Sequence, residues 1–292
     1  FYDSLLPGVL GDKKSEQVSA LGYSLGYLGG GLLFAFNVWF YLQPHFWGFA
    51  DGVEAIRFSF FSVGIWWILF SIPLFIWVKE PKGSSAAAPL KGVIKTIRNL
   101  NKNTLVFLFA FWLYIDGVDT IISMAIDYGM SIGLDKQSLI IALLITQFVG
   151  FPAALGFGFL SNKLPTRPLI LLAIGVYFLV VFGASQMTKP IHFYILAGTI
   201  GLVQGGIQSL SRGYFARMVP PTRSAEHFAL YNLVGKSASI IGPLAVGYTT
   251  LWTGDHRRGI LSLCILFAAG GFLLLKVKDP DSSDPKYNGD SH

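Results

Sequence analysis

The sequence predicts an all-α, polytopic membrane protein with eight transmembrane helices. Charged residues make up 13% of the chain, against about 25% in soluble domains. Eight apolar stretches are long enough to span a bilayer, because a helix rises about 1.5 Å per residue and about 20 residues cross the hydrocarbon core. Lipid offers the backbone no hydrogen-bond partner, so each stretch is expected to be a helix. The stretches cover residues 17–42, 56–78, 104–131, 138–161, 168–187, 191–214, 227–251 and 259–277.

The distribution of basic residues predicts the orientation of these spans. If the segment before the first span is cytoplasmic, 16 of the 22 Lys and Arg residues fall in cytoplasmic segments, five fall in external segments, and Lys236 lies inside a span. Cytoplasmic loops carry the excess of positive charge. Both ends of the chain are therefore expected in the cytoplasm. The net charge of +6 is a topology signal, and we expect no binding to nucleic acid.

The longest polar connection divides the chain into two spans and six. Residues 79–103 begin with a Ser- and Ala-rich link. Residues 90–100 then alternate apolar and basic positions at helical spacing, which predicts an amphipathic helix on the inner membrane surface. The alternative is a solvated linker whose apolar residues pack on the spans. The resulting segments are 1–78, the linker 79–103, a six-helix bundle over 104–278 and a cytoplasmic tail over 279–292.

A division into two spans and six fits a transporter built from two six-helix halves with a cytoplasmic linker between them. The chain begins at Phe1, and its first ten residues resemble the end of an earlier span. We therefore expect the sequence to be truncated at its N-terminus. Residues 17–78 would then be a helix pair that packs poorly on the six-helix bundle.

Polar residues inside the apolar spans are the candidate functional residues, because such groups are costly in hydrocarbon unless they are paired or hydrated. Asp116, Asp119, Ser123 and Asp127 follow one another at steps of 3, 4 and 4, which places them on one face of a helix. A single buried acid could be structural, but three acids on one stripe favour a water-filled cavity.

Two other spans carry polar stripes. Gln204 and Gln208 lie on the span 191–214, and they suit either a substrate or hydrogen bonds between helices. Asn232 and Lys236 lie on the span 227–251, with Lys236 too deep to reach the surface easily. Arg212 and Arg217 lie near the cytoplasmic end, where we expect their side chains to extend to the interface.

Glycine and proline predict where helices approach each other or break. Gly22, Gly26 and Gly30 repeat every four residues, a spacing that lets membrane helices pack closely. Pro243 follows Gly242 inside the last polar span and can break that helix locally.

Several motifs resemble known families. Residues 158–167 (GFLSNKLPTR) resemble a cytoplasmic loop of the major facilitator superfamily, with Gly158, Lys163 and Arg167 at matching positions, Asn162 in place of an acid and Pro165 in place of a glycine. Four further stretches resemble the vacuole-effluxer family within that superfamily: LGYSLGYLGGGLL at 21–33, YIDGVDTI at 114–121, GGIQSLSRGYFARMVP at 205–220 and FALYNLVGKSASIIGP at 228–243.

The resemblance covers residues 1–278 and implies helices five to twelve of a twelve-helix fold. It also implies a transporter of small solutes, with amino-acid export among fungal relatives. In that fold the spans 104–131 and 227–251 are neighbours, so Lys236 is expected to pair with Asp116 or Asp119.

The function expected from these observations is secondary active transport of a small polar solute by alternating access, coupled to protons. The sequence has no HExxH, GxSxG or P-loop motif and no Cys/His cluster, so we expect neither an enzyme nor a bound cofactor or metal. Amino acids are the first candidate substrates. The alternatives are a transporter of sugars, peptides or drugs, and a receptor or scaffold that transports nothing. We expect a monomer in a bacterial cell membrane, with the vacuolar membrane as the eukaryotic alternative.

Overall fold

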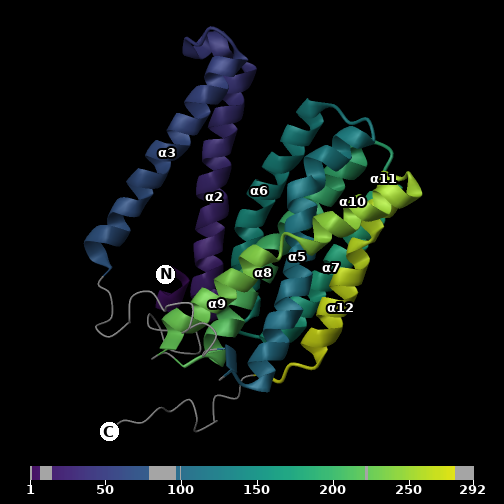
Figure 1. The fold of residues 1–292 in the computed structure, drawn as a ribbon. Helices are drawn as coiled ribbons and strands as arrows, with labels where there is room; N and C mark the ends of the chain where they lie inside the picture. The colour runs from purple at the N-terminus through teal and green to yellow at the C-terminus, as the bar shows by residue number, and fades with distance from the viewer. Residues whose placement is uncertain (1, 7–14, 79–96, 99, 221–222, 280–292) are drawn as a thin grey trace.

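All the regular secondary structure of the described residues is helical (Figure 1). The computed structural model describes residues 2–6, 15–78, 97–98, 100–220 and 223–279. Its helices are η1 (Tyr2–Leu5), α2 (Ser15–Leu42), η3 (Pro44–Trp47), α3 (Gly52–Trp77), α5 (Lys102–Ser131), α6 (Lys136–Leu160), α7 (Thr166–Gln186), α8 (Pro190–Met218), α9 (Ser224–Ser237), α10 (Ile241–Thr253), α11 (His256–Leu261) and α12 (Leu263–Leu275).

Local capping interactions determine where the long helices begin. The carboxylate of Asp51 accepts a hydrogen bond from the Glu54 amide at 2.8 Å, and the side chain of Asn101 accepts one from the Thr104 amide at 2.7 Å. Asp135 caps α6 in the same way through the Ser138 amide at 2.9 Å. These side chains satisfy amides that have no partner inside the helix. The helices therefore begin within four residues of the predicted starts of their spans.

The described residues include seven candidate spans that are long and apolar enough to cross a membrane. Six are single helices, and the seventh combines α11 and α12 over 256–275. Large apolar side chains such as Phe75, Trp77 and Leu251 are exposed on the outside of the helices, as lipid-facing residues are. The prediction of an all-α, multi-pass membrane protein is confirmed.

The helices from α5 onward form a bundle whose core lies mainly between α5, α7, α8 and α12. Tyr177 of α7 stacks on Phe267 of α12, with ring centroids 5.5 Å apart. Phe107 of α5 packs on Tyr214 of α8 at 5.3 Å. These side chains are fully buried, so close packing of aromatic rings constrains how α5 is rotated against α8 and α7 against α12.

The first two long helices differ in how they pack. Helix α2 lies along α6 and α8, whereas α3 packs mainly against α2 and stands away from the bundle (Figure 1). The expectation that both helices would pack poorly is therefore wrong for α2. Glycines of α6 allow the approach, because Gly158 lies directly against Ala20 of α2 and Gly150 against the ring of Tyr27. The division of the chain at the linker remains a prediction.

The predicted span 227–251 is two helices, α9 and α10, separated by residues 238–240. The break that we expected near Pro243 therefore lies at residues 238–240, and the Gly242–Pro243 pair falls in the first turn of α10. The predicted amphipathic helix over 90–100 lies largely outside the described residues, and so does the tail beyond residue 279.

Candidate functional site

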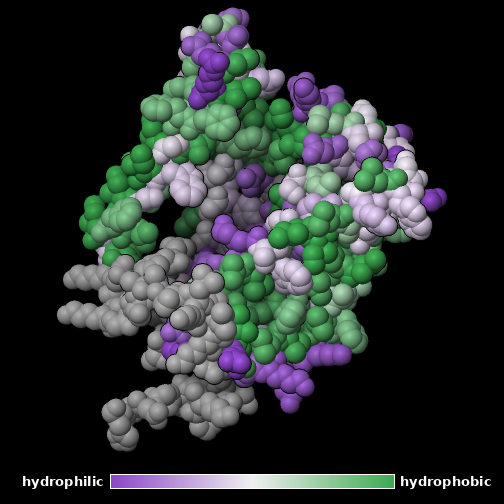
Figure 2. Space-filling model, in the orientation of Figure 1, coloured by the Kyte–Doolittle hydropathy of each residue, from purple (hydrophilic) through white to green (hydrophobic). Residues whose placement is uncertain are grey.

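A polar cavity of about 370 Å³ lies between α2, α5, α8 and α9. Figure 2 shows hydrophilic residues in the hollow between α2 and the bundle, with hydrophobic surfaces around them. We call this space the central cavity and define it by its lining residues: Tyr23, Phe111, Ile115, Asp119, Gln208, Tyr231, Asn232, Gly235, Lys236 and Ser239. Four of the residues predicted from the sequence, Asp119, Gln208, Asn232 and Lys236, therefore share one cavity.

Residues of opposite charge line this cavity. Asp119 is half-buried, and its Oδ2 accepts a hydrogen bond of 3.4 Å from Ser239 Oγ. Lys236 is exposed and makes no ion pair within 4.0 Å with a described residue. The predicted pair between Lys236 and Asp116 or Asp119 is therefore wrong for this conformation. An acid and an amine that face the same cavity without pairing can both bind a ligand.

Asp116 is oriented differently from Asp119. Its side chain is buried, and both of its carboxylate oxygens accept hydrogen bonds from backbone amides at the start of α10. The expectation that it faces the cavity is therefore corrected. Ser123 and Asp127, the other members of the predicted stripe, are exposed, and Ser123 Oγ donates a 3.2 Å hydrogen bond to the carbonyl of Thr120.

A second polar cavity, of about 500 Å³, adjoins the first and shares Tyr23 and Gln208 with it. Its other lining residues are Gly22, Gly26, Tyr27, Gln147, Gln204 and Arg212. The hydroxyl of Tyr27 donates a 3.3 Å hydrogen bond to Gln208 Oε1. Gln204 Oε1 is buried and has no hydrogen-bond partner among the described residues. Gln208 therefore bridges two helices, while Gln204 keeps an acceptor available to a ligand or water.

The sequence reasoning missed the aromatic lining. Tyr23 and Tyr27 of α2 and Phe111 and Tyr231 of the bundle surround the two cavities. Phe111 stacks on Tyr231 with ring centroids 4.3 Å apart. The four-residue spacing of Tyr23 and Tyr27 was a usable signal, because it places both rings on one face of the helix.

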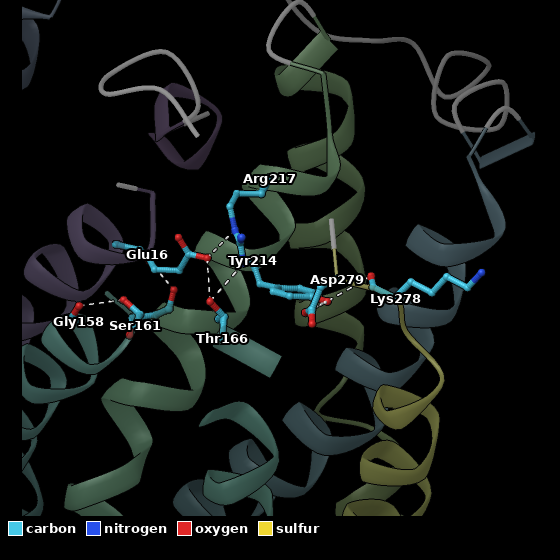
Figure 3. Close-up of polar contacts among 10 residues, drawn as sticks. Glu16, Gly158, Ser161, Thr166, Tyr214, Arg217, Lys278 and Asp279 are labelled. Carbon is cyan, nitrogen blue, oxygen red and sulfur yellow. Dashed lines mark hydrogen bonds and ion pairs between the residues drawn. The ribbon is translucent and has the colours of Figure 1, made fainter. Parts of the chain in front are cut away.

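The end of the molecule predicted to be cytoplasmic is closed by contacts between α2 and the bundle. Glu16 of α2 pairs with Arg217 of α8 at 2.7 Å, and Glu16 also accepts a 3.0 Å hydrogen bond from Thr166 of α7 (Figure 3). Ser19 Oγ donates to the Ser209 carbonyl at 2.7 Å. The guanidinium of Arg217 is thus engaged by α2, and its position relative to the membrane interface remains a prediction.

Arg212 is held one turn deeper by α2 and the N-terminal segment. It pairs with Asp3 at 2.7 Å, donates to Ser19 Oγ at 2.9 Å, and lies over the ring of Tyr23 at 4.7 Å. This arginine also lines the second cavity. Its side chain therefore connects the closed end of the molecule to the polar interior.

The loop that resembles the superfamily motif lies at the same end. Gly158 is buried against Ala20 of α2. A Cβ on residue 158 would lie only 2.7 Å from the Ala20 Cβ, so a larger residue has no room there. Arg167 donates to the carbonyl of Val277, which ties the loop to the end of α12. Asn162 and Lys163 are exposed. Gly158 and Arg167 therefore support the contacts that close this end.

Other glycines that we expected at helix contacts contribute less. A Cβ at Gly26 would meet no atom within 4 Å, and one at Gly30 would meet only Gln147 at 4.0 Å. Tight contacts occur instead at Gly205, Gly206 and Gly213 of α8. Within the described residues, no group of three or more His, Cys, Asp or Glu side chains could hold a metal ion.

A polar cavity among membrane-spanning helices, lined by an acid and an amine, is an arrangement found in membrane transporters. Residues 10–283 match the family described as "Vacuole effluxer Atg22 like". The chain belongs to this family, as its motifs suggested.

Its relatives include bacterial and fungal proteins. The chain is similar to the uncharacterized MFS-type transporter YxiO of Bacillus subtilis, with 36% identity over 294 residues that cover 97% of the chain and 68% of the relative. Autophagy-related protein 22-1 of Aspergillus niger is 26% identical over 296 residues, 91% of the chain and 47% of the relative. Autophagy-related protein 22 of Coccidioides immitis is 27% identical over 302 residues, which cover 91% of the chain and 49% of the relative. The chain thus spans about half the length of these fungal relatives.

Proposed function

We propose that the protein is a secondary active transporter that moves a small polar solute, with amino acids as the first candidates, and couples this movement to protons. The observation that carries the proposal is the central cavity, where Asp119 and Lys236 line one space without forming an ion pair. A zwitterion presents one positive and one negative group, so it can satisfy both side chains at once.

The rest of the lining supports the same class of ligand. Gln208 and Asn232 add hydrogen-bond donors and acceptors without net charge. Tyr23, Phe111 and Tyr231 supply apolar surface and ring faces that attract an ammonium group. An amino acid combines these features: two charged groups close together and a side chain of variable polarity.

Proton coupling is assigned to Asp119. Carboxylates inside a membrane bundle commonly mark proton pathways. Asp119 faces the cavity and has one long hydrogen bond to a neutral hydroxyl, so a bound proton would not disrupt a helix contact. Loading and release of this proton on opposite sides requires alternating access, and the contacts of Glu16 and Ser19 with α7 and α8 close one side.

The test is transport by the purified protein in proteoliposomes with an imposed pH gradient and a panel of labelled amino acids. Gradient-driven accumulation of at least one amino acid is expected. Asp119→Asn should abolish accumulation but leave counterflow intact, whereas Lys236→Gln should weaken both. Asp127→Asn is the matched control, because Asp127 is an exposed acid on the same helix and its loss should change neither.

Two results would contradict the proposal. If no amino acid moves, the substrate assignment fails. If accumulation persists in Asp119→Asn, the coupling site lies elsewhere, and Gln204 and Gln208 in the second cavity become the next positions to test.

A further inference from the structure

The break between α9 and α10 creates a structural problem that one side chain resolves. Helix α9 ends at Ser237 and α10 begins at Ile241. The first amides of a helix have no partner inside it, and inside a membrane bundle such groups are costly if left unpaired. Ile240, which precedes α10, makes no side-chain cap. The amides at the start of α10 therefore need partners from another helix.

Asp116 of α5 supplies these partners. Its Oδ2 accepts a hydrogen bond from the Ile241 amide at 3.0 Å, and its Oδ1 accepts one from the Gly242 amide at 2.8 Å. The next residue, Pro243, has no amide hydrogen, and the Leu244 amide reaches the Ile240 carbonyl at 3.4 Å. One carboxylate thus satisfies both amides in the first three positions of α10.

The surroundings of this contact fit its partners closely. Asp116 is 1% exposed, and Thr120, one turn further along α5, donates a 3.2 Å hydrogen bond to its Oδ1. A Cβ on residue 242 would collide with Thr120 Oγ1 and would lie 2.7 Å from Asp116 Oδ1. The carboxylate can therefore reach both amides only because residue 242 is a glycine. The positive end of the α10 dipole also favours a negative charge at this position.

The break carries residues of the central cavity on its α9 side and within it. Lys236 is in the last turn of α9, and Ser239 lies in the break itself. Ser239 also donates to Asp119, which is one turn from Asp116 on α5. The position of the break therefore determines where the cavity's amine and this hydroxyl lie relative to its acid.

From these contacts we infer that Asp116 is a positioning residue: it fixes the break between α9 and α10 and so places Lys236 and Ser239 opposite Asp119. Two acids one helical turn apart thus have separate roles. Asp119 faces the ligand space, and Asp116 holds the backbone of the neighbouring helix. The consequence for transport rests on the proposed function, but the role in the break can be measured independently of it.

Hydrogen–deuterium exchange of the purified protein tests the positional role, read on the peptide that contains residues 238–245. Asp116→Ala and Asp116→Asn should each speed exchange of the Ile241 and Gly242 amides by about tenfold or more, since a hydrogen bond to a charged acceptor is worth at least that factor. Asn is not a rescue here, because its NH₂ group would face an amide donor. Thr120→Val keeps both backbone hydrogen bonds and should have a smaller effect.

Two controls separate this effect from general loosening. Asp127→Asn, which removes an exposed acid from the same helix, should leave exchange of the 238–245 peptide unchanged, and peptides from α7 should exchange at the parent rate in every variant. If Asp116→Ala does not fold, Gly242→Ala replaces it, because the new methyl group would lie 2.7 Å from Asp116 Oδ1, which is too close for the carboxylate to keep its present contact with α10. The inference would be overturned if Ile241 and Gly242 exchange at the parent rate in the folded Asp116 variants. The same result in Gly242→Ala would overturn it where that variant replaces them.

Counterflow of labelled amino acids tests the consequence of this positioning for transport. Asp116→Asn should raise the half-saturating concentration about tenfold or more with little change in maximal rate, since Lys236 is displaced but Asp119 is retained. A parent-like half-saturating concentration alongside faster exchange would overturn the link to the cavity. If the parent protein moves no amino acid, the proposed function fails while the exchange result still decides the role of Asp116.

Discussion

The ion pair between Glu16 and Arg217 is expected to hold the predicted cytoplasmic end closed. Glu16 lies at the start of α2, and Arg217 lies in the last turn of α8. Their charged groups are 2.7 Å apart, and Thr166 of α7 donates to the same carboxylate oxygen (Figure 3). Glu16→Gln keeps the size of the side chain and removes its charge. The closed arrangement then leaves Arg217 without a counter-charge in a largely buried site.

The size of the effect follows from the burial of the pair. The side chains of Glu16 and Arg217 are 7% and 25% exposed. Removing one partner of a fully buried pair costs about 3–5 kcal/mol. Partial exposure of Arg217 reduces this figure through solvent screening, so we expect about 2 kcal/mol. That difference corresponds to a shift of about 30-fold in the ratio of open to closed molecules.

Thiol labelling of a buried position measures this shift. Ser209 is fully buried where α8 meets α2, and Ser209→Cys changes the side chain little. In this background Glu16→Gln should speed labelling by a membrane-impermeant maleimide about 30-fold, if labelling samples the open state. Glu226→Gln is the matched control, because its pair with Arg223 is 36% and 42% exposed. An exposed pair of this kind contributes about 0–1 kcal/mol, so labelling should change by a few-fold at most.

Two results would refute the reasoning. Labelling at the parent rate in Glu16→Gln would mean that the pair contributes nothing to closure. Equal acceleration by Glu16→Gln and Glu226→Gln would mean that the effect reflects total charge and has no connection with this contact.

Three further predictions concern stability, each read from thermal unfolding of the purified protein. Gly206→Ala should destabilise the bundle by about 1–3 kcal/mol through overpacking, because the new methyl group would overlap the Phe157 ring. Gly156→Ala on the facing helix is the control and should be neutral, since its methyl group would meet nothing within 4 Å. Equal effects of the two substitutions would contradict this prediction. Phe267→Ala should cost about 3–5 kcal/mol, because the buried ring stacks on Tyr177 and contacts Gly117; a loss below that of Gly206→Ala would contradict it. Hydrogen bonds from Ser138 hold the pKa of Asp135 below its ordinary value. The ionised Asp135 carboxylate therefore stabilises the fold at neutral pH, and this stabilisation is lost as the pH falls through the lowered pKa. Asp135→Asn should therefore lower stability at neutral pH and flatten its acid dependence, and an unchanged pH profile would count against this role.

Local features of the chain were enough to predict the class of protein and the positions of its spans. Length and hydropathy identify a bilayer-spanning helix because lipid leaves the backbone no alternative. The helical period also grouped Gln208 with Gln204 and Asn232 with Lys236, and Asp119, Gln208, Asn232 and Lys236 do line one cavity. Family membership was also predictable from short motifs, because those motifs contain residues at helix contacts and in the break between α9 and α10.

The tertiary structure decided which partner each polar side chain takes. The helical period places Asp116 and Asp119 on one face, yet Asp116 binds the amides of α10 and Asp119 faces the cavity. Arg217 pairs with Glu16, about 200 residues away in the chain. These choices depend on how closely neighbouring helices approach and how each is rotated. Contacts at Gly158, Gly206 and Gly242 set that approach between segments far apart in sequence, so no local pattern in the chain contains it.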